Sequence, residues 1–150
     1  MTAQLTGTVE LRAALRKFGV NADSEIVQIV NGTAQNIRTH AIKSIQRGTK
    51  SGIVYSKKRS KSGKSVEHRA SAPGEAPATD EGILANSIKA DIDGKKAEIV
   101  ADTEYAAWLE FGTQKMQPRP FMFPAMEKER PKWKARLNRI VDAAAKGIIK

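Results

Sequence analysis

Residues 85–102, ANSIKADIDGKKAEIVAD, decide the fold that we expect, because turn chemistry and hydrophobic alternation agree there. Asp93-Gly94 is a strong two-residue turn signal of β-hairpins. A turn centred on these residues pairs Ala90 with Ala97 and Ile88 with Ile99, which places the apolar side chains on one face. The charged side chains that point away from that face are Lys89, Asp91, Lys96 and Glu98.

Two helices are predicted before this hairpin. Residues 8–19 form a short helix that Gly19 ends, and residues 21–48 form a long helix that Gly48 ends. Asp23 or Ser24 can cap the start of the long helix. Its apolar face recurs at steps of three and four residues through Ile26, Val30, Thr33, Ile37, Ala41 and Ile45. Because this stripe is one-sided, we expect the helix to lie against a sheet or a neighbouring helix.

The C-terminal third is also predicted to be mainly helical. Residues 102–112 form a short helix that Asp102 or Thr103 caps and Gly112 ends, with a buried stripe of Tyr105, Trp108 and Leu109. A longer helix follows, in which Pro124 suits the first turn. Pro131 would cost about 3 kcal/mol in a helix interior. We therefore expect a kink or a break there, with a new helix from about residue 131.

A second hairpin is predicted at about residues 52–70, with strands near Ile53–Tyr55 and Ser65–His68. Its cations are Lys57, Lys58, Arg59, Lys61, Lys64 and Arg69. Residues 37–70 carry ten basic groups and one acid, whereas residues 71–126 carry five basic groups and nine acids. Such asymmetry is typical of a nucleic-acid partner, or of copies that meet through opposite patches. A solvated flexible loop would explain the hairpin tip equally well.

The stretch EFGTQKMQPRPFMFPA, residues 110–125, combines apolar side chains with three prolines. Prolines hold a backbone extended, which lowers the entropy cost of ordering it against a partner. The sequence leaves two alternatives for an arm at about residues 111–125: a loop that covers the chain's own core, or an apolar arm that contacts another subunit. The candidate interface residues of this arm are Phe111, Met116, Arg119, Phe121, Met122 and Phe123.

Several function classes find no support in the sequence. The chain has no cysteine, so it has neither a thiolate metal site nor a cysteine nucleophile. His40 and His68 lie in different predicted elements without a second ligand at metal spacing, and Asp91 and Asp93 belong to a solvated strand face and a turn. No glycine motif cradles a phosphate, and no apolar run reaches the length of a membrane span. We expect no enzyme, metal, cofactor or membrane, and no signal peptide at the N-terminus.

Three motifs together resemble the tail-component family of lambda-like, long-tailed bacteriophages. They are a Ser-Ala-Pro-Gly-Glu-x-Pro turn, a Tyr-Ala-x-x-Leu-Glu-Phe-Gly-Thr segment and an Arg-Pro-Phe-x-x-Pro-Ala block, which stand at residues 71–77, 105–113 and 119–125. The resemblance covers about residues 20–140 in order and spacing. The lysine-rich tip at residues 57–64 falls in a segment that varies in this family.

The resemblance implies a non-enzymatic protein of the virion, made in the host cytoplasm, that forms a hexameric ring at the head–tail junction. Its partners would be copies of itself, the connector or head-completion protein, and the tail-tube or tail-terminator protein. The basic hairpin would face DNA in the channel or an acidic neighbouring ring. The alternative function is a free nucleic-acid-binding protein using the same hairpin, and a tail-terminator or tube protein is a third interpretation. The expected architecture is a single α+β domain spanning residues 1–150. A long N-terminal helix packs on a small antiparallel sheet of two hairpins, and a C-terminal helix follows.

Overall fold

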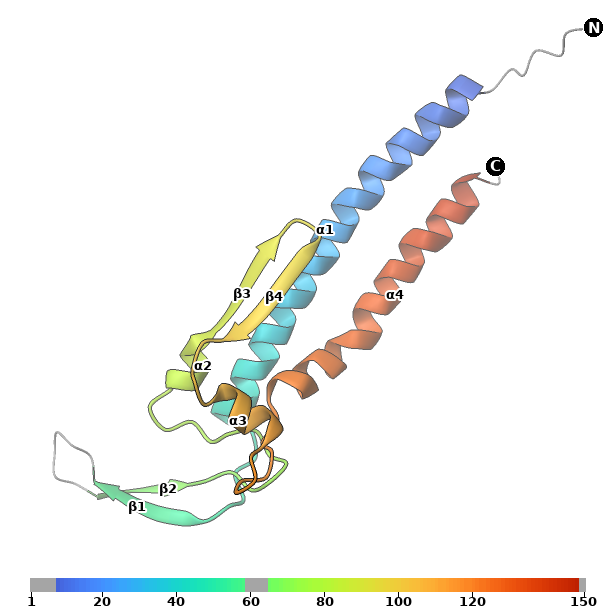
Figure 1. Ribbon diagram of the computed structural model, residues 1–150. Helices are drawn as coiled ribbons and strands as arrows, with labels where there is room; N and C mark the ends of the chain where they lie inside the picture. The colour runs from blue at the N-terminus through green and yellow to red at the C-terminus, as the bar shows by residue number, and fades with distance from the viewer. Residues whose placement is uncertain (1–7, 59–64, 149–150) are drawn as a thin grey trace, which may run out of the picture.

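The computed structural model describes residues 8–58 and 65–148 of the 150-residue chain. Its elements follow in the order α1 (Thr8–Arg47), β1 (Val54–Lys58), β2 (Ser65–Arg69), α2 (Ile83–Ser87), β3 (Ile88–Asp93), β4 (Lys96–Ala101), α3 (Ala106–Phe111) and α4 (Met122–Ile148). Figure 1 shows the β3–β4 hairpin along one side of α1 and α4 along the other, while the β1–β2 hairpin extends away from one end. The expected α+β fold is confirmed, and the two hairpins form separate two-stranded antiparallel sheets.

Helix α1 is continuous, so the predicted break at Gly19 is wrong. A single glycine costs a helix only about 1 kcal/mol, and no proline follows it here. Asp23 does not start a helix but lies within α1, where its carboxylate pairs with Lys95 Nζ at 2.6 Å. The predicted end is confirmed, because α1 stops at Arg47 and the N–H of Gly48 donates to the carbonyl of Ser44 at 2.9 Å.

The β3–β4 hairpin forms as expected, but the predicted register is wrong. Asp93 pairs with Lys96, so Gly94 and Lys95 form the loop. Gly94 has φ 56 and Lys95 does not have a positive φ, which is the pattern of a type II′ turn with glycine in its first position. Ile88 consequently lies opposite Ala101 instead of Ile99. Because side chains alternate with a period of two, this two-residue shift leaves the apolar residues on one face.

The core lies where α1 meets β3, α2, α3 and the start of α4. Its buried members are Ile37, Ala41, Ile45, Leu84, Ala85, Ile88, Ala106, Phe121 and Ala125. The helical spacing of the α1 residues predicted this face, and each large aliphatic side chain buried there contributes about 1.5–3 kcal/mol. Arg38 Nε also donates to the carbonyl of Ile88 at 2.9 Å, which fixes α1 against β3.

Helix α4 contains both prolines of the C-terminal segment. Pro124 lies in its first turn, as predicted. Of the two alternatives expected at Pro131, the break with a new helix is wrong, because α4 continues to Ile148. Figure 1 shows the course of α4 bent along its first half, which agrees with the alternative of a kink. Pro131 removes the hydrogen bond to the carbonyl of Glu127. Since Pro131 is exposed, water can hydrate that carbonyl and the helix persists.

Candidate assembly surface

The proline-rich segment between α3 and α4 folds back on its own chain. The N–H of Arg119 donates to the carbonyl of Leu109 at 2.7 Å, and Thr113 pairs with Met116 across the loop. The N–H of Gly74, in the Ser-Ala-Pro-Gly-Glu turn, donates to the carbonyl of Pro118 at 2.9 Å. The backbone of this segment is therefore a loop on the chain's own fold, which was the first of the two alternatives. The motifs at residues 105–113 and 119–125 contact each other through the bond from Arg119 to Leu109.

Two of the three motifs, at residues 71–77 and 105–113, each use a glutamate to satisfy backbone N–H groups. Glu75 accepts hydrogen bonds from the N–H and Oγ of Ser51 and from the N–H of Ala72, at 2.6–2.9 Å. The bonds from Ser51, followed by that from Ala72, hold the pKa of Glu75 below its ordinary value. These contacts fix the turn at residues 71–77 to the segment that enters the β1–β2 hairpin.

Glu110 performs the same task at the start of α4. Its Oε2 accepts from the N–H groups of Phe121 and Met122 at 2.8 and 3.0 Å, and its Oε1 accepts from the N–H of Phe123 at 2.7 Å. The first N–H groups of a helix have no partner within the helix, so this carboxylate supplies one from α3. A negative charge at a helix N-terminus is also favourable. Glu110 thereby fixes the angle between α3 and α4, a role that the sequence analysis missed.

The six predicted interface residues divide between the core and the surface. Phe121 is only 2% exposed and belongs to the chain's own core. Met122 packs against that core, and Met116 and Arg119 are half-buried. Phe111, in contrast, is 80% exposed, and Phe123 is also exposed. The structure therefore leaves these two phenylalanines accessible to a partner.

The exposed phenylalanines border an apolar groove of about 370 Å³ between α3, α4 and β4. We call it the α3–α4 groove; it is lined by Ile99, Val100, Ala101, Ala106, Ala107, Glu110, Phe111, Phe121, Met122, Phe123 and Met126. Glu110 is the one charged residue of this lining, and the cap occupies both of its oxygens.

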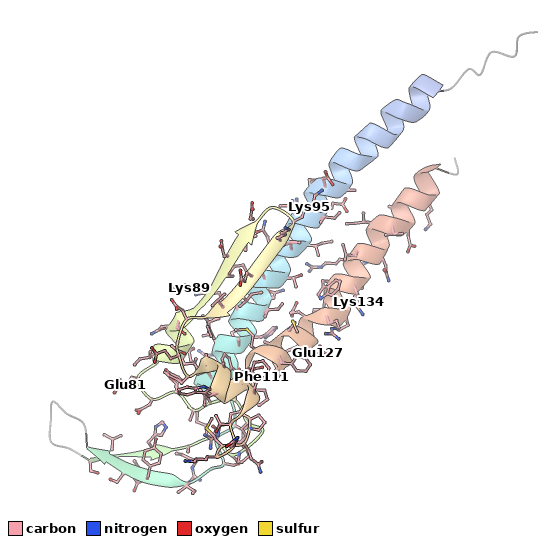
Figure 2. The ribbon with its side chains drawn as sticks, viewed as in Figure 1. Glu81, Lys89, Lys95, Phe111, Glu127 and Lys134 are labelled. Carbon is pink, nitrogen blue, oxygen red and sulfur yellow. The ribbon has the colours of Figure 1, made fainter. Side chains whose placement is uncertain are left out.

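A second apolar groove of about 480 Å³ lies between α1, β4 and α4. We call it the α1–α4 groove; its lining comprises Ile26, Ile29, Val30, Thr33, Ala34, Ile37, Lys95, Ala97, Ile99, Met126, Arg130, Trp133 and Leu137. Ile99 and Met126 line both grooves, so the two grooves adjoin at these residues. The side-chain view in Figure 2 shows Lys95 and Lys134 on opposite sides of the space between the sheet and α4. Part of the predicted stripe of α1 thus faces an uncovered groove.

Helix α3 presents aromatic side chains that we expected to be buried. The predicted end at Gly112 is confirmed, but Tyr105 is the N-cap residue and no side chain caps the helix. Leu109 packs against the core as predicted. The prediction for Tyr105 and Trp108 is wrong, because both are exposed and Trp108 has 57% of its surface accessible. Ala106 takes the buried position instead, so α3 lies rotated relative to the expected stripe.

The described strands of the β1–β2 hairpin carry three of the six predicted cationic residues. Lys57 and Lys58 lie on β1 and pair with Val66 and Ser65, whereas Arg59, Lys61 and Lys64 lie outside the described residues. Arg69 is exposed on β2. Apolar side chains are exposed beside these cations, namely Ile53, Val54, Tyr55 and Val66. A two-stranded ribbon is at best marginally stable alone in water, which makes this hairpin a candidate contact surface.

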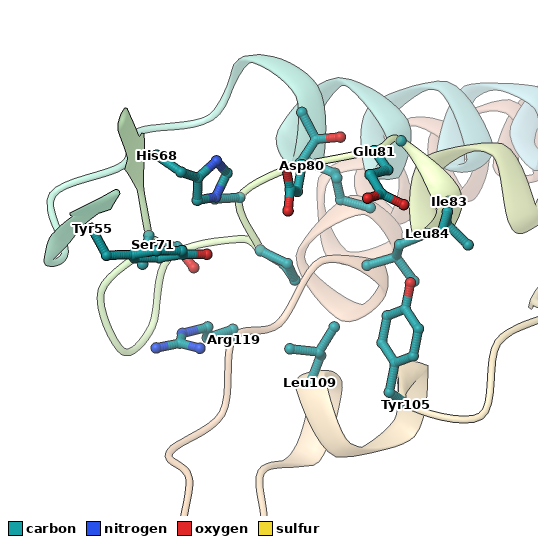
Figure 3. Close-up of a pocket in the computed structure, with 16 residues that line it drawn as sticks. Tyr55, His68, Ser71, Asp80, Glu81, Ile83, Leu84, Tyr105, Leu109 and Arg119 are labelled. Carbon is teal, nitrogen blue, oxygen red and sulfur yellow. The ribbon is translucent and has the colours of Figure 1, made fainter. Parts of the chain in front are cut away.

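A pocket of about 410 Å³ lies between the base of this hairpin, α2 and α3. Figure 3 shows Tyr55 and His68 on its hairpin side, Tyr105 and Leu109 on the α3 side, and Arg119 near Ser71. The rings of Tyr55 and His68 lie 5.2 Å apart. Arg119 Nε is buried, and the described residues offer it no hydrogen-bond acceptor. Asp80 and Glu81 add carboxylates to the lining, so the pocket holds charges of both signs.

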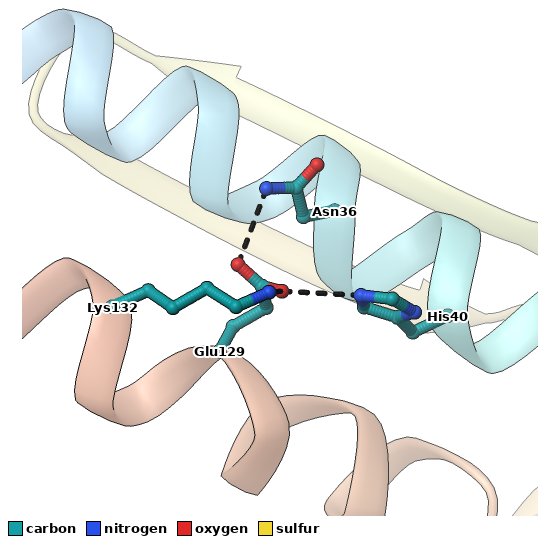
Figure 4. Close-up of polar contacts among 4 residues, drawn as sticks. All are labelled: Asn36, His40, Glu129 and Lys132. Atoms are coloured by element: carbon teal, nitrogen blue, oxygen red, sulfur yellow. Dashed lines mark hydrogen bonds and ion pairs between the residues drawn. The ribbon is translucent and has the colours of Figure 1, made fainter.

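His40, which was considered above as a candidate ligand, belongs to a polar cluster between α1 and α4. Glu129 is 2% exposed. It accepts hydrogen bonds from Asn36 at 3.2 Å and Lys132 at 2.6 Å, and His40 Nε2 lies 3.1 Å from its Oε1. Figure 4 shows these four residues between α1 and α4. Burial favours a higher pKa for Glu129, but the hydrogen bonds from Lys132, Asn36 and His40 outweigh it and the pKa is lowered. His40 therefore helps to join α1 to α4.

The structure also bears on metal and membrane sites. Within residues 8–58 and 65–148, no cluster of three or more His, Cys, Asp or Glu side chains is placed to bind a metal ion. In the same part of the chain, no helix combines the length and apolar character needed to cross a membrane. No protein-family model, curated protein or solved structure matches this chain.

Proposed function

We propose that this chain is a structural protein of a long-tailed bacteriophage virion, which assembles as a homo-oligomeric ring at the head–tail junction. In this role it joins the capsid connector to the tail tube by protein contacts alone. The resemblance of residues 71–77, 105–113 and 119–125 to phage tail components supports the position. The exposed apolar surface of α3 and α4 supports the assembly.

That exposed surface is the observation that carries the proposal. The whole chain has only eight aromatic residues, and Trp108, Phe111 and Phe123 expose more than half of their surface. Phe111 and Phe123 also line the apolar α3–α4 groove. Monomeric proteins rarely expose large contiguous apolar patches, and aromatic residues are enriched in interface cores. A second subunit would remove these side chains from water.

Rigidity of the same surface supports assembly as well. Glu110 and the loop hydrogen bonds hold α3 against the start of α4 before any partner binds. A preorganised surface loses less conformational entropy on binding. The burial of Phe121 serves this purpose, because it anchors the segment that presents Phe123.

Electron cryomicroscopy of virions of the phage that encodes this chain tests the position. We expect averaged images of the neck to show a ring of this chain between connector and tube, with Phe111 and Phe123 against another subunit. Virions that lack the chain would refute the proposal. In complementation, Phe111→Ser should yield unjoined heads and tails, whereas Lys43→Ser, an exposed change on α1, should leave infectivity intact.

A second candidate function is nucleic-acid binding through the β1–β2 hairpin. Its support is the projection of this hairpin from the body, together with the cations Lys57, Lys58 and Arg69. Binding to phosphates would weaken steeply as salt rises. Fluorescence titration with duplex DNA at several salt concentrations tests this function, and Lys57→Glu combined with Arg69→Glu should abolish it. Virions that assemble normally with this double variant would show that joining does not depend on the hairpin.

A further inference from the structure

We propose that α3 of one copy docks into the α1–α4 groove of the next copy, with Trp108 and Phe111 entering the apolar floor of the groove. This inference rests on the proposed ring and names the two surfaces that form its subunit contact. The occupant is a second copy of this chain, because one copy carries both an exposed aromatic helix and an uncovered apolar groove.

The inserting surface is a short, rigid aromatic face. Trp108 and Phe111 are three residues apart on α3, so both side chains lie on the same side of the helix. Ala106 and Leu109 occupy the opposite side and pack on the core. Glu110 and the bond from Arg119 to Leu109 hold this helix in place. Short helices that present aromatic anchors are a common mode of binding to apolar grooves.

The receiving surface has room for this helix. The α1–α4 groove extends along α1 from Ile26 to Ile37, which is about 16 Å at the rise of an α-helix. The six residues of α3 span about 9 Å. Trp133 and Leu137 of α4 supply the far wall, and the floor contains aliphatic side chains of α1 and β4. An aromatic face therefore meets an apolar surface of sufficient length.

Charge selects this occupant over another apolar surface. Residues 102–111 carry the three acids Asp102, Glu104 and Glu110 and no base, a net charge of −3. Residues 127–139 of α4 carry six bases and the two acids Glu127 and Glu129, a net charge of +4. Opposite patches steer two surfaces together and fix their register.

Individual cations stand at the margins of the groove. Lys95 and Arg130 line it, and Lys134 lies one helical turn beyond Arg130 on the same side of α4. Lys95 and Arg130 pair with Asp23 and Glu127 within the chain, but such exposed pairs contribute little and exchange readily. Glu104 is exposed and precedes the aromatic face by one turn, so it is the acid placed to reach these cations.

The contact joins two different surfaces, and each copy has both. Such a heterologous contact leaves one α3 and one groove free at the ends of a row of copies, and it closes into a ring when the rotation between neighbours permits. A closed ring buries every α3 and every groove. The contact between α3 and the α1–α4 groove can thus form the closed ring that the proposed function requires.

Cysteine cross-linking of the purified chain tests the docking, because the natural sequence has no cysteine. Phe111→Cys on one copy is mixed with Leu137→Cys on another and treated with a short bismaleimide. We expect dimers from this mixture. The matched control replaces Leu137→Cys with Asn138→Cys, the next residue on α4, which is exposed and does not line the groove. Equal yields at positions 137 and 138, self-linking of Phe111→Cys as the main product, or no dimer at millimolar protein would each overturn the proposal.

A charge exchange provides a second measurement that does not depend on cysteine. Glu104→Lys alone and Lys134→Glu alone should each weaken association about tenfold, which sedimentation velocity can measure. Mixing the two variants should restore association, because both contacts between unlike variants bring opposite charges together, whereas contacts between two copies of the same variant bring like charges together. Failure of the mixture to recover would contradict the pairing.

The docking and the proposed function can fail separately. If the expected cross-links form but virions lack the chain, the phage role is refuted and the docking stands. If the chain forms a neck ring but the expected cross-links do not form, the docking is refuted and the phage role stands.

Discussion

The glutamate cap between α3 and α4 gives the sharpest prediction for stability. Glu110→Ala removes the acceptor of three backbone N–H groups, those of Phe121, Met122 and Phe123. Hydrogen bonds to charged groups contribute about 1.5–3 kcal/mol each, and the loss of a helix cap costs about 0.5–2 kcal/mol. Phe123 is exposed, so its N–H can bind water when the carboxylate is removed. The loss of stability is therefore smaller than the sum of three full hydrogen bonds.

From these contributions we expect Glu110→Ala to lower the free energy of unfolding by about 2–4 kcal/mol. Glu110→Gln keeps one oxygen acceptor but loses the charge at the helix N-terminus, so it should lower that free energy by about half as much. Urea unfolding followed by circular dichroism would measure both changes. The alanine variant should shift the midpoint by about 1–2 M.

The matched control for this experiment is Glu104→Ala, which removes an exposed glutamate of the same segment. Surface changes of this kind usually alter stability by less than about 0.5 kcal/mol. If Glu110→Ala proved no more destabilising than Glu104→Ala, the cap would not fix α3 to α4. The preorganisation invoked for assembly would then lose its basis.

Three further predictions concern other parts of the fold. Phe121→Ala should cost about 3–5 kcal/mol of stability, because it empties a buried site, whereas Phe111→Ala should leave the unfolding midpoint nearly unchanged and reduce oligomerisation in native mass spectrometry. Gly112→Ala should destabilise the chain more than Gly74→Ala in thermal unfolding. Both glycines have positive φ, so both changes introduce backbone strain. An added Cβ at residue 112 would also meet the carbonyl oxygen of Met116 at 2.8 Å, whereas at residue 74 it would meet open space. The pKa of Glu129 lies below its ordinary value of 4.5, so its contribution is complete above that pH and is lost as the pH falls through the folded pKa. Glu129→Gln should therefore be less stable than wild type at neutral pH and should lose less of its stability on acidification below pH 4.5, in unfolding titrations across that range.

The sequence alone determined the elements and their faces wherever a local pattern was sufficient. Alternation in residues 88–101 placed the apolar face of β3 and β4 correctly, even though the register was wrong. The two-residue period explains this, since any even shift preserves the face. The spacing of Ile37, Ala41 and Ile45 identified the buried side of α1, and glycine at residue 112 marked the end of α3.

Tertiary structure decided what the local pattern could not. Tyr105 and Trp108 fit a buried stripe in sequence, but α3 is too short for periodicity to fix its rotation, and its packing buries Ala106 instead. The choice between an arm and a loop at residues 111–125 depended on Glu110, whose partners lie eleven to thirteen residues away. No local pattern encodes such contacts, because they arise from the angle between two helices. The same holds for the α1–α4 groove, whose lining comes from elements separated by most of the chain and becomes a surface only when they pack.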